Sequence, residues 1–223
     1  MRQFVLFIAF ILSSIQISAQ FSDQLDPDFG TNGSQDHFYN VSLLPVKIAT
    51  RADNKIVVLT QGTIGNGYLR VSLMNENGTG LESSFGIQNS QSTFGSSFGT
   101  ISQALRPSDM VVLADNSILI GGQITNSNPT RQDLFVMKLT PNGTLDQSFG
   151  TNGIVSKRLN EDFAVNLRAH GMAVATDGSI YISGSPQLSN VYITHFNADG
   201  TPDLDYGVNG WATIPQDLSL IHI

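Results

Sequence analysis

The sequence predicts an all-β protein, a β-propeller-like array of repeated small sheets. One phrase of nine residues, seen as Leu-Asp-Gln-Ser-Phe-Gly-Thr-Asn-Gly at Leu145–Gly153, occurs in four versions along the chain. Short apolar runs alternate with turns rich in Asn, Asp and Gly, and no stretch after the N-terminal segment shows a sustained period of 3.6 residues. In the expected strands Leu134–Leu139 and Val191–Phe196, apolar residues lie on both faces, which indicates sheets covered on both sides.

The N-terminal residues 1–19 have the features of a secretory signal peptide. Arg2 precedes the apolar run Phe4–Leu12, and a more polar stretch ends in small residues at Ala19. A bilayer span takes roughly 20 apolar residues, so this run is too short to be one. We therefore expect a secreted or extracytoplasmic protein, in the periplasm or at the cell surface, without a membrane span.

Composition excludes several classes of function. The chain has 18 acidic and 11 basic residues, and removal of Arg2 with the signal leaves 10 − 18 = −8. An acidic chain of this kind lacks the basic face that a nucleic-acid backbone requires. The chain has no cysteine, so disulfides, thiolate metal sites and cysteine nucleophiles are excluded.

Three markers recur in the same order and define the repeat over residues 20–217. The glycine after the aromatic residue of the phrase recurs at steps of 56, 64 and 57 residues, at Gly30, Gly86, Gly150 and Gly207. A hairpin signal recurs at steps of 62, at Asp53-Asn54-Lys55, Asp115-Asn116-Ser117 and Asp177-Gly178-Ser179. A second turn signal occurs at Asn77-Gly78, Asn142-Gly143 and Asp199-Gly200. The units fall at about 24–80, 81–144 and 145–201, with a partial unit at 202–217.

Each unit is expected to hold four strands. The first strands precede the hairpin signal that begins with aspartate (the Asp turn), and they are expected at Val46–Arg51, Ser108–Ala114 and Gly171–Thr176. The second strands leave it, at Ile56–Leu59, Ile118–Ile120 and Ile180–Ile182. The third strands end in the Asn-Gly or Asp-Gly turn, at Leu69–Met74, Leu134–Leu139 and Val191–Phe196. The fourth follow the phrase, at about Ser34–Leu43, Phe94–Ile101, Ile154–Leu159 and Trp211–Ile214.

The repeat length favours a propeller. Blades of four strands run to about 40–50 residues, and immunoglobulin-like tandems to about 100. The expected fold is about three four-stranded blades plus the start of a fourth, an incomplete ring; a tandem β-sandwich is the alternative. The last six residues, Leu218–Ile223, match the translation of a transposon-end sequencing adapter. We therefore expect the native protein to continue past about Asp217 with further blades.

The phrase, the Asp hairpin and the Asn-x-Asp-Gly turn together resemble the delta-60 repeat, an uncharacterised β-propeller repeat of large exported bacterial proteins. The resemblance covers about Gln24–Pro215. The first unit departs by one extra residue before Leu81, and the second phrase has Ile87-Gln88-Asn89 in place of Thr-Asn-Gly. The resemblance implies architecture and export, and it brings no catalytic residue.

Acidic and histidine side chains are the next candidates for a site. Asp26, Glu82, Asp146 and Asp203 share one repeat position, and we interpret them as turn caps in preference to a ring of cation- or sugar-binding carboxylates. A second acidic group could offer oxygen ligands to Ca²⁺, although its spacing is not that of an EF-hand: Asn197, Asp199, Asp203 and Asp205. No histidine recurs at a repeat position; the four are His37, His170, His195 and His222.

Signatures of nucleophilic or phosphate chemistry are weak. Gly95, Ser97 and Gly99 match the letters of the Gly-x-Ser-x-Gly elbow, but no helix is expected after them. Gly121-Gly122 is expected to end a strand without the helix and lysine of a phosphate loop. The sequence therefore predicts no catalytic, cofactor-binding or metal-binding residue and no cofactor.

The leading hypothesis is a non-enzymatic scaffold or interaction module for an unknown protein or carbohydrate. The divergent segments Gln61–Gly67, Gln88–Gly99 and Gln123–Gln132 are its candidate contact loops. The alternative is a propeller-based enzyme of hydrolase, lyase or quinoprotein type whose site lies in missing blades. The repeated phrase is assigned to joining blades: its aromatic residue wedges between neighbours, and its glycine turns the chain from one outer strand to the next inner strand.

Overall fold

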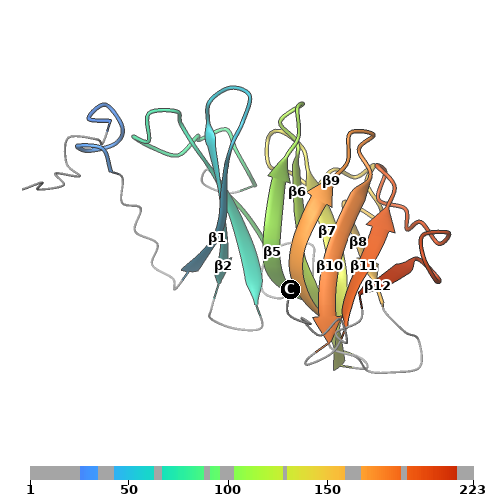
Figure 1. The fold of residues 1–223 in the computed structure, drawn as a ribbon. Helices are drawn as coiled ribbons and strands as arrows, with labels where there is room; N and C mark the ends of the chain where they lie inside the picture. Colours follow the sequence, from blue (N-terminus) through green and yellow to red (C-terminus); the bar gives the residue numbers. More distant parts are fainter. Residues whose placement is uncertain are drawn as a thin grey trace, which may run out of the picture.

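The computed structural model describes residues 26–34, 43–62, 67–87, 91–95, 103–127, 130–158, 167–186 and 190–214. These residues form three four-stranded antiparallel sheets and contain no helix (Figure 1). The all-β, propeller-like fold class is confirmed, and the three sheets do not close into a ring. Within this part of the chain, no helix is long and apolar enough to cross a membrane.

Each sheet is a meander in which consecutive strands pair with one another. Sheet 1 contains β1 (Leu43–Thr50), β2 (Ile56–Gly62), β3 (Tyr68–Met74) and β4 (Gln91–Gly95). Sheet 2 contains β5 (Ala104–Val112), β6 (Ile118–Ser127), β7 (Thr130–Leu139) and β8 (Ile154–Lys157). Sheet 3 contains β9 (Leu167–Val174), β10 (Ile180–Pro186), β11 (Val191–Phe196) and β12 (Trp211–Ile214).

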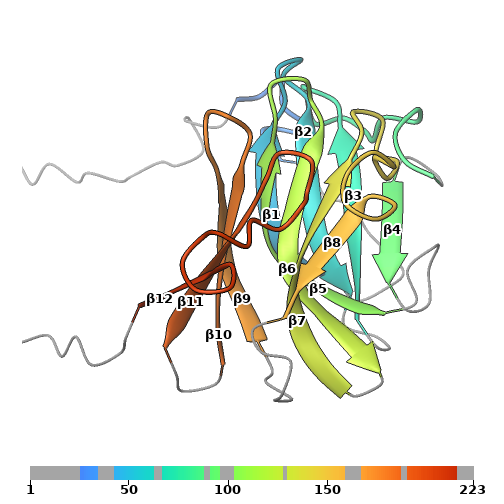
Figure 2. The same cartoon turned by 90° about the vertical axis from the view of Figure 1, so that its right-hand side faces the viewer.

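The hairpins between the first and second strands form as the Asp turns predict. Asn54, Asn116 and Gly178 have φ of 62°, 66° and 86°, a region that Asn and Gly adopt more readily than other residues. The preceding aspartate accepts a hydrogen bond from the backbone two residues on; for Asp115 this N–H is that of Ser117, at 2.9 Å. The three hairpins lie at one end of the sheets, as Figure 2 shows.

Each first strand carries a β-bulge at the same repeat position. The register between the first and second strands shifts between Pro45 and Lys47 in sheet 1 and between Pro107 and Asp109 in sheet 2. In sheet 3 the register shift lies between Ala169 and Gly171, so His170 has no opposite residue on β10. A bulge re-aims the residues around it, so the same change of direction occurs at one height on all three first strands.

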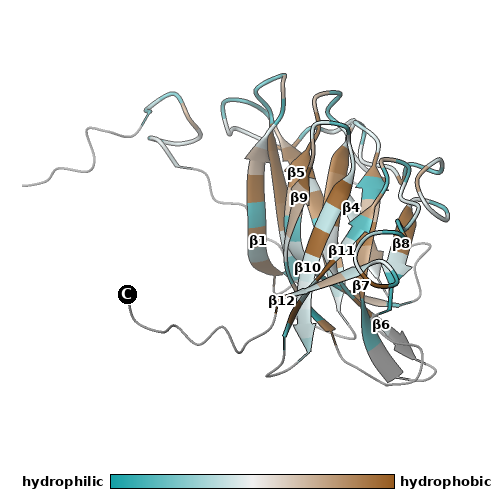
Figure 3. Cartoon of the chain, turned by 45° about the vertical axis from the view of Figure 1, so that its right-hand side comes forward, coloured by the Kyte–Doolittle hydropathy of each residue, from teal (hydrophilic) through white to brown (hydrophobic). Residues whose placement is uncertain are grey.

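The core lies between the sheets and accounts for the apolar residues on both faces of the third strands. Phe135, Met137 and Leu139 of β7 join the cluster shared with sheet 1, whereas Leu134 and Val136 join the cluster shared with sheet 3. All five are fully buried. Figure 3 shows apolar residues along the strands and polar residues on many of the connections.

The place of the repeated phrase differs from the prediction. The phrase at 145–153 connects β7 to β8, the third and fourth strands of one sheet, so it does not carry the chain from one blade to the next. For the same reason Trp211–Ile214 is the outer strand of sheet 3 and does not open a fourth sheet. The fourth strand of sheet 1 is Gln91–Gly95, earlier than the expected Phe94–Ile101. The expected strand at Ser34–Leu43 lies almost entirely outside the described residues.

The aromatic residue of the phrase does wedge against the neighbouring blade, as predicted. A Cβ placed on Gly143 would lie 2.7 Å from the Phe85 ring, and one on Gly200 would lie 2.9 Å from the Phe149 ring. The glycine after each aromatic donates its N–H to the same neighbouring turn: Gly86 N–H to the Asn142 carbonyl at 2.8 Å, and Gly150 N–H to the Asp199 carbonyl at 2.8 Å.

The phrase at 26–34 makes the same contact with sheet 1. Gly30 N–H donates to the Asn77 carbonyl at 2.7 Å, and a Cβ on Gly78 would lie 2.5 Å from the Phe29 ring. One contact pattern therefore recurs at three junctions, and sheets 1, 2 and 3 follow one another as consecutive blades.

Candidate functional site

The recurring acids mostly serve the turns of the phrase, as the sequence predicts. The Oδ1 atoms of Asp26, Asp146 and Asp203 accept N–H groups two residues on, at 3.0, 3.1 and 3.0 Å. Hydrogen bonds from Ser148, together with Lys138, outweigh burial and lower the pKa of the Asp146 carboxyl. Glu82 differs, because its carboxylate pairs with Lys55 at 3.1 Å.

The carboxylates proposed for Ca²⁺ are turned toward protein partners. Asp199 Oδ1 accepts the Thr201 N–H at 2.8 Å and the Thr201 hydroxyl at 2.7 Å. Asp203 Oδ2 lies 2.9 Å from His195 Nδ1, and this hydrogen bond is the main cause that lowers the pKa of Asp203. Among the described residues, no three acidic or histidine side chains lie together as metal ligands would.

The histidines and glycines singled out in the sequence lie apart from one another. His195 stacks on Tyr181, with ring centroids 4.4 Å apart, whereas His170 lies on β9. His37, His222, Ser97 and Gly99 are outside the described residues. Gly121 and Gly122 lie inside β6, which contradicts the expectation that they end a strand. A Cβ on Gly122 would meet the Arg106 carbonyl at 2.3 Å, so this glycine is required by the close approach of β5.

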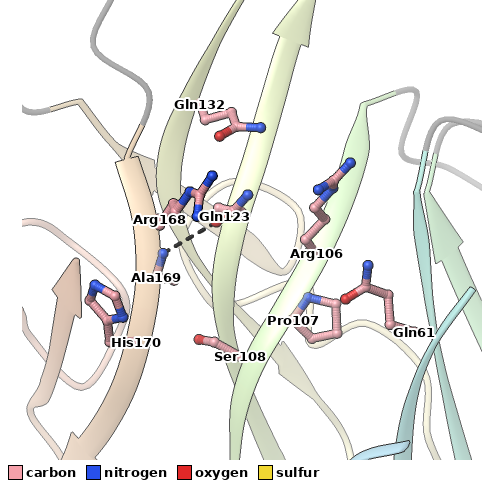
Figure 4. A pocket seen from close by; sticks show the side chains of 9 residues that line it. All are labelled: Gln61, Arg106, Pro107, Ser108, Gln123, Gln132, Arg168, Ala169 and His170. Carbon is pink, nitrogen blue, oxygen red and sulfur yellow. Dashed lines mark hydrogen bonds between the residues drawn. The ribbon is translucent and has the colours of Figure 1, made fainter. Parts of the chain in front are cut away.

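A polar pocket of about 510 Å³ lies where strands of all three sheets meet. Figure 4 shows its side chains, which come from β2, β5, β6, β7 and β9. They are Gln61, Arg106, Pro107, Ser108, Gln123, Gln132, Arg168, Ala169 and His170. The pocket is on the first strands, beside the bulges, and it draws on three consecutive blades. It is the candidate functional site.

Two arginines give this pocket its charge. Arg106 and Arg168 are exposed and occupy equivalent positions on β5 and β9, directly before the bulge. Within the described part of the chain neither forms an ion pair, and no acidic residue lines the pocket. In a chain with a net charge of −7, an uncompensated pair of guanidinium groups favours an anionic or strongly polar ligand.

Gln123 is fixed across the junction of two blades. Its Oε1 accepts the backbone N–H of Ala169 at 3.3 Å, which joins β6 to β9. Because this bond needs an acceptor, it identifies which atom of the Gln123 side-chain amide is the oxygen. The Nε2 atom of Gln123 is then a hydrogen-bond donor on the pocket wall, beside the Gln132 amide (Figure 4). The wall can therefore donate hydrogen bonds from amides as well as from guanidinium groups.

The serine and histidine of the pocket make hydrogen bonds within the protein. The Ser108 hydroxyl donates to the Gly121 carbonyl at 3.3 Å. His170 Nε2 lies 2.6 Å from the Ser185 hydroxyl on β10, where either atom can donate. This His–Ser pair is exposed, and no described carboxylate accepts a hydrogen bond from its imidazole. Its geometry is thus weaker than that of a catalytic triad, in which a third group holds the base.

The sequence marked three of the pocket residues and missed the two arginines. Gln61, Gln123 and Gln132 lie at ends of two predicted contact loops. The predicted loop Gln123–Gln132 is mostly strand, because β6 runs to Ser127 and β7 begins at Thr130. Arg106 and Arg168 are 62 residues apart, the same step as the Asp hairpins. That spacing places both arginines at one repeat position, although the same position on β1 holds Leu44.

Comparison with known families places this region in a propeller context. A family described as "Domain of unknown function (DUF5122) beta-propeller" matches residues 113–149. The match runs from the β5–β6 hairpin through β6 and β7 to Phe149. Comparison with curated proteins gave no match. A β-propeller type of domain is thereby supported.

Proposed function

We propose that this protein is a non-enzymatic interaction module whose ligand-binding site is the pocket between β5, β6 and β9. One observation carries the proposal: the pocket gathers amide and guanidinium donors from three consecutive blades, and none of the described residues that line it is acidic. Donors on a rigid sheet scaffold suit recognition of a polar protein or carbohydrate surface, because little ordering is needed on binding. The resemblance to delta-60 repeats, which are architectural, agrees with this role.

A binding experiment with a filled pocket tests the proposal. Ser108→Trp introduces a large ring at the pocket wall, and Lys55→Gln changes one charge in the β1–β2 hairpin at the far end of the sheets. The full chain and both variants are applied to arrays of polysaccharides and extracellular proteins, after circular dichroism has verified folding. We expect ligands to be retained by wild type and Lys55→Gln and lost by Ser108→Trp. Ligands retained equally by all three proteins would place the binding surface elsewhere.

If Ser108→Trp does not fold, ligand-induced protection replaces it as the readout. A ligand in the pocket slows hydrogen exchange at the amides of β6 and β9 that border it, and leaves the β1–β2 hairpin unchanged. Protection confined to other strands contradicts the assignment.

The enzymatic alternative is kept because of the exposed His170–Ser185 pair. A serine hydroxyl that can pass its proton to an imidazole is the beginning of a nucleophilic site. Ser185→Ala separates the two functions: it removes the hydroxyl and leaves the arginines and amides in place. Turnover of a bound polysaccharide or ester that disappears in Ser185→Ala favours the enzyme, whereas binding without turnover favours the interaction module.

An extracytoplasmic location is part of the same proposal and rests on the features of residues 1–19. Expression of the full chain in a bacterial host tests it. The exported protein is expected to begin at Gln20, which mass spectrometry of the periplasmic fraction measures. Retention of residues 1–19 by the purified protein contradicts it.

A further inference from the structure

We propose that the pocket binds an acidic polysaccharide, one whose sugar units carry carboxylates, and that Arg106 and Arg168 hold those carboxylates. The inference rests on the pocket being the binding site proposed above, and it adds the chemical class of the ligand. Three features of the pocket carry it: its charge, the repeat of that charge, and the polar character of the rest of the wall.

The charge of the pocket is opposite to that of the molecule. The chain carries a net charge of −7, yet the described lining of the pocket has two arginines and no acidic residue. Asp109, one residue along β5 from Ser108, is committed elsewhere: its carboxylate pairs with Lys47 at 2.9 Å and accepts the Met172 N–H at 3.0 Å. The guanidinium groups are therefore left to a ligand. A guanidinium group matches a carboxylate in planar, two-bond geometry.

The two charges repeat with the blades. Arg106 and Arg168 occupy the same position on neighbouring first strands, and Leu44 occupies it on β1. In Figure 4 the two arginines lie on either side of β6, with Gln123 between them. Two equivalent cationic positions on adjacent blades fit a ligand that presents its carboxylate more than once, as a polymer of uronate units does.

The rest of the wall suits hydroxyl groups better than apolar side chains. Gln61, Gln123 and Gln132 contribute amides, and Ser108 contributes a hydroxyl. Among the described residues that line the pocket, the apolar ones are Pro107 and Ala169, and none is aromatic. The modes of peptide recognition that use apolar or aromatic anchors need pockets that this wall does not supply. A hydroxyl-rich, carboxylate-bearing chain matches both kinds of donor.

Titration calorimetry with a short oligogalacturonate tests the inference. We expect the wild type to bind it and not its fully methyl-esterified form, in which each carboxylate is neutral. Loss of one charge-assisted hydrogen-bonding group weakens binding about tenfold, so Arg106→Gln and Arg168→Gln are each expected to do so. The double variant is expected to lose binding, and Lys55→Gln to retain it. Both arginines are exposed, so the variants are expected to keep the wild-type melting temperature.

The conservative variant separates charge from geometry. Arg106→Lys with Arg168→Lys keeps both positive charges and loses the planar fork, so intermediate affinity and a steeper loss with added salt are expected. The inference is overturned if wild type does not bind oligogalacturonate, if the methyl ester binds equally well, if the double glutamine variant binds normally, or if polyglutamate binds more tightly.

The outcomes also distinguish this inference from the proposed function. A neutral polysaccharide or a protein that is lost on Ser108→Trp but unaffected by the arginine variants overturns the ligand class and leaves the pocket as the binding site. Binding of oligogalacturonate that survives Ser108→Trp overturns the pocket itself.

Discussion

The contact between an aromatic ring and a glycine is the smallest unit that repeats from blade to blade. Phe29 covers Gly78, Phe85 covers Gly143, and Phe149 covers Gly200. Each of these three glycines has a positive φ, between 70° and 85°, because it turns the chain after the third strand. The glycine therefore satisfies two requirements: the turn needs its backbone conformation, and the neighbouring ring needs the space a side chain would fill.

The two requirements can be separated by comparing two glycines. Gly178→Ala introduces a side chain at φ 86° where the nearest atom, of Ala198, is 3.1 Å away, so the cost is mainly backbone strain of about 1 kcal/mol. Gly143→Ala adds a clash with the Phe85 ring at 2.7 Å, and overpacking costs a further ~1–3 kcal/mol. Urea unfolding of both variants measures the difference. Equal losses would mean that the ring is not a wedge.

Single residues also show where sequence reasoning succeeds and fails. The wedge was predictable because one aromatic residue recurs beside one glycine. The pocket was not, although its arginines recur at a 62-residue step, because two of three first strands carry them and Leu44 breaks the pattern. In the sequence alone, two arginines at one repeat position cannot be distinguished from coincidence. Their significance follows from the fold, in which the bulged first strands place them beside the Gln123 amide.

At the scale of elements, the first strands of the three sheets are tied together by one carboxylate. Asp109 on β5 pairs with Lys47 on β1 and accepts the Met172 N–H on β9. Burial raises the pKa of Asp109, but the hydrogen bonds from Lys47 and from the Met172 and Met110 N–H groups outweigh it and hold the pKa below its usual value. The ionised form is thus favoured by folding.

Asp109→Asn is expected to lower the free energy of unfolding by about 1–2 kcal/mol at pH 7, because the charge is removed while the shape is kept. Half-exposure of Lys47 limits the effect. Since the folded pKa is depressed, the wild-type advantage is present above the unfolded pKa of about 3.9 and is lost as pH falls through the folded value.

Urea unfolding at pH 7 and at about pH 3 measures this advantage. It should shrink at the lower pH, and a constant difference would contradict the ionic role of Asp109. Lys55→Gln, which removes the Lys55–Glu82 pair away from the first strands, is the matched control.

The sequence predicted the strands well and the boundaries between sheets poorly. Val191–Phe196 and Trp211–Ile214 form as expected. The phrase was assigned to the crossing between blades, yet it lies within a sheet. In a meander every connection is a turn, so turn chemistry alone does not say which connection leaves the sheet. The crossings fall at about 96–103 and 158–166, where the sequence carries no repeated marker.

At the scale of the whole molecule, burial depends on how many neighbouring sheets a blade has. Sheet 2 contributes to both core clusters, and its third strand β7 is buried from Asp133 to Met137. Sheet 3 contributes to one cluster, and four of the six residues of β11 are half-buried. The large exposed apolar side chains all belong to the two terminal sheets and their connections: Leu44, Ile48 and Ile87 in sheet 1, and Leu204, Val208 and Ile214 in sheet 3.

This gradient predicts the order in which the blades open. Local opening exposes amides to exchange, and segments with fewer buried apolar contacts open at lower free energy. We expect the slowest hydrogen exchange in β6 and β7 and faster exchange in β11 and β12, by a factor of about ten for each 1.4 kcal/mol of difference in opening free energy. Mass spectrometry of exchange in the full chain measures it. Gly143→Ala should speed exchange in both sheets 1 and 2, since it loosens the junction between them, whereas Gly178→Ala should act mainly within sheet 3. Equal protection of β7 and β11 in the wild type would mean that each blade's stability is set within its own sheet, and that the ring-on-glycine junctions add little.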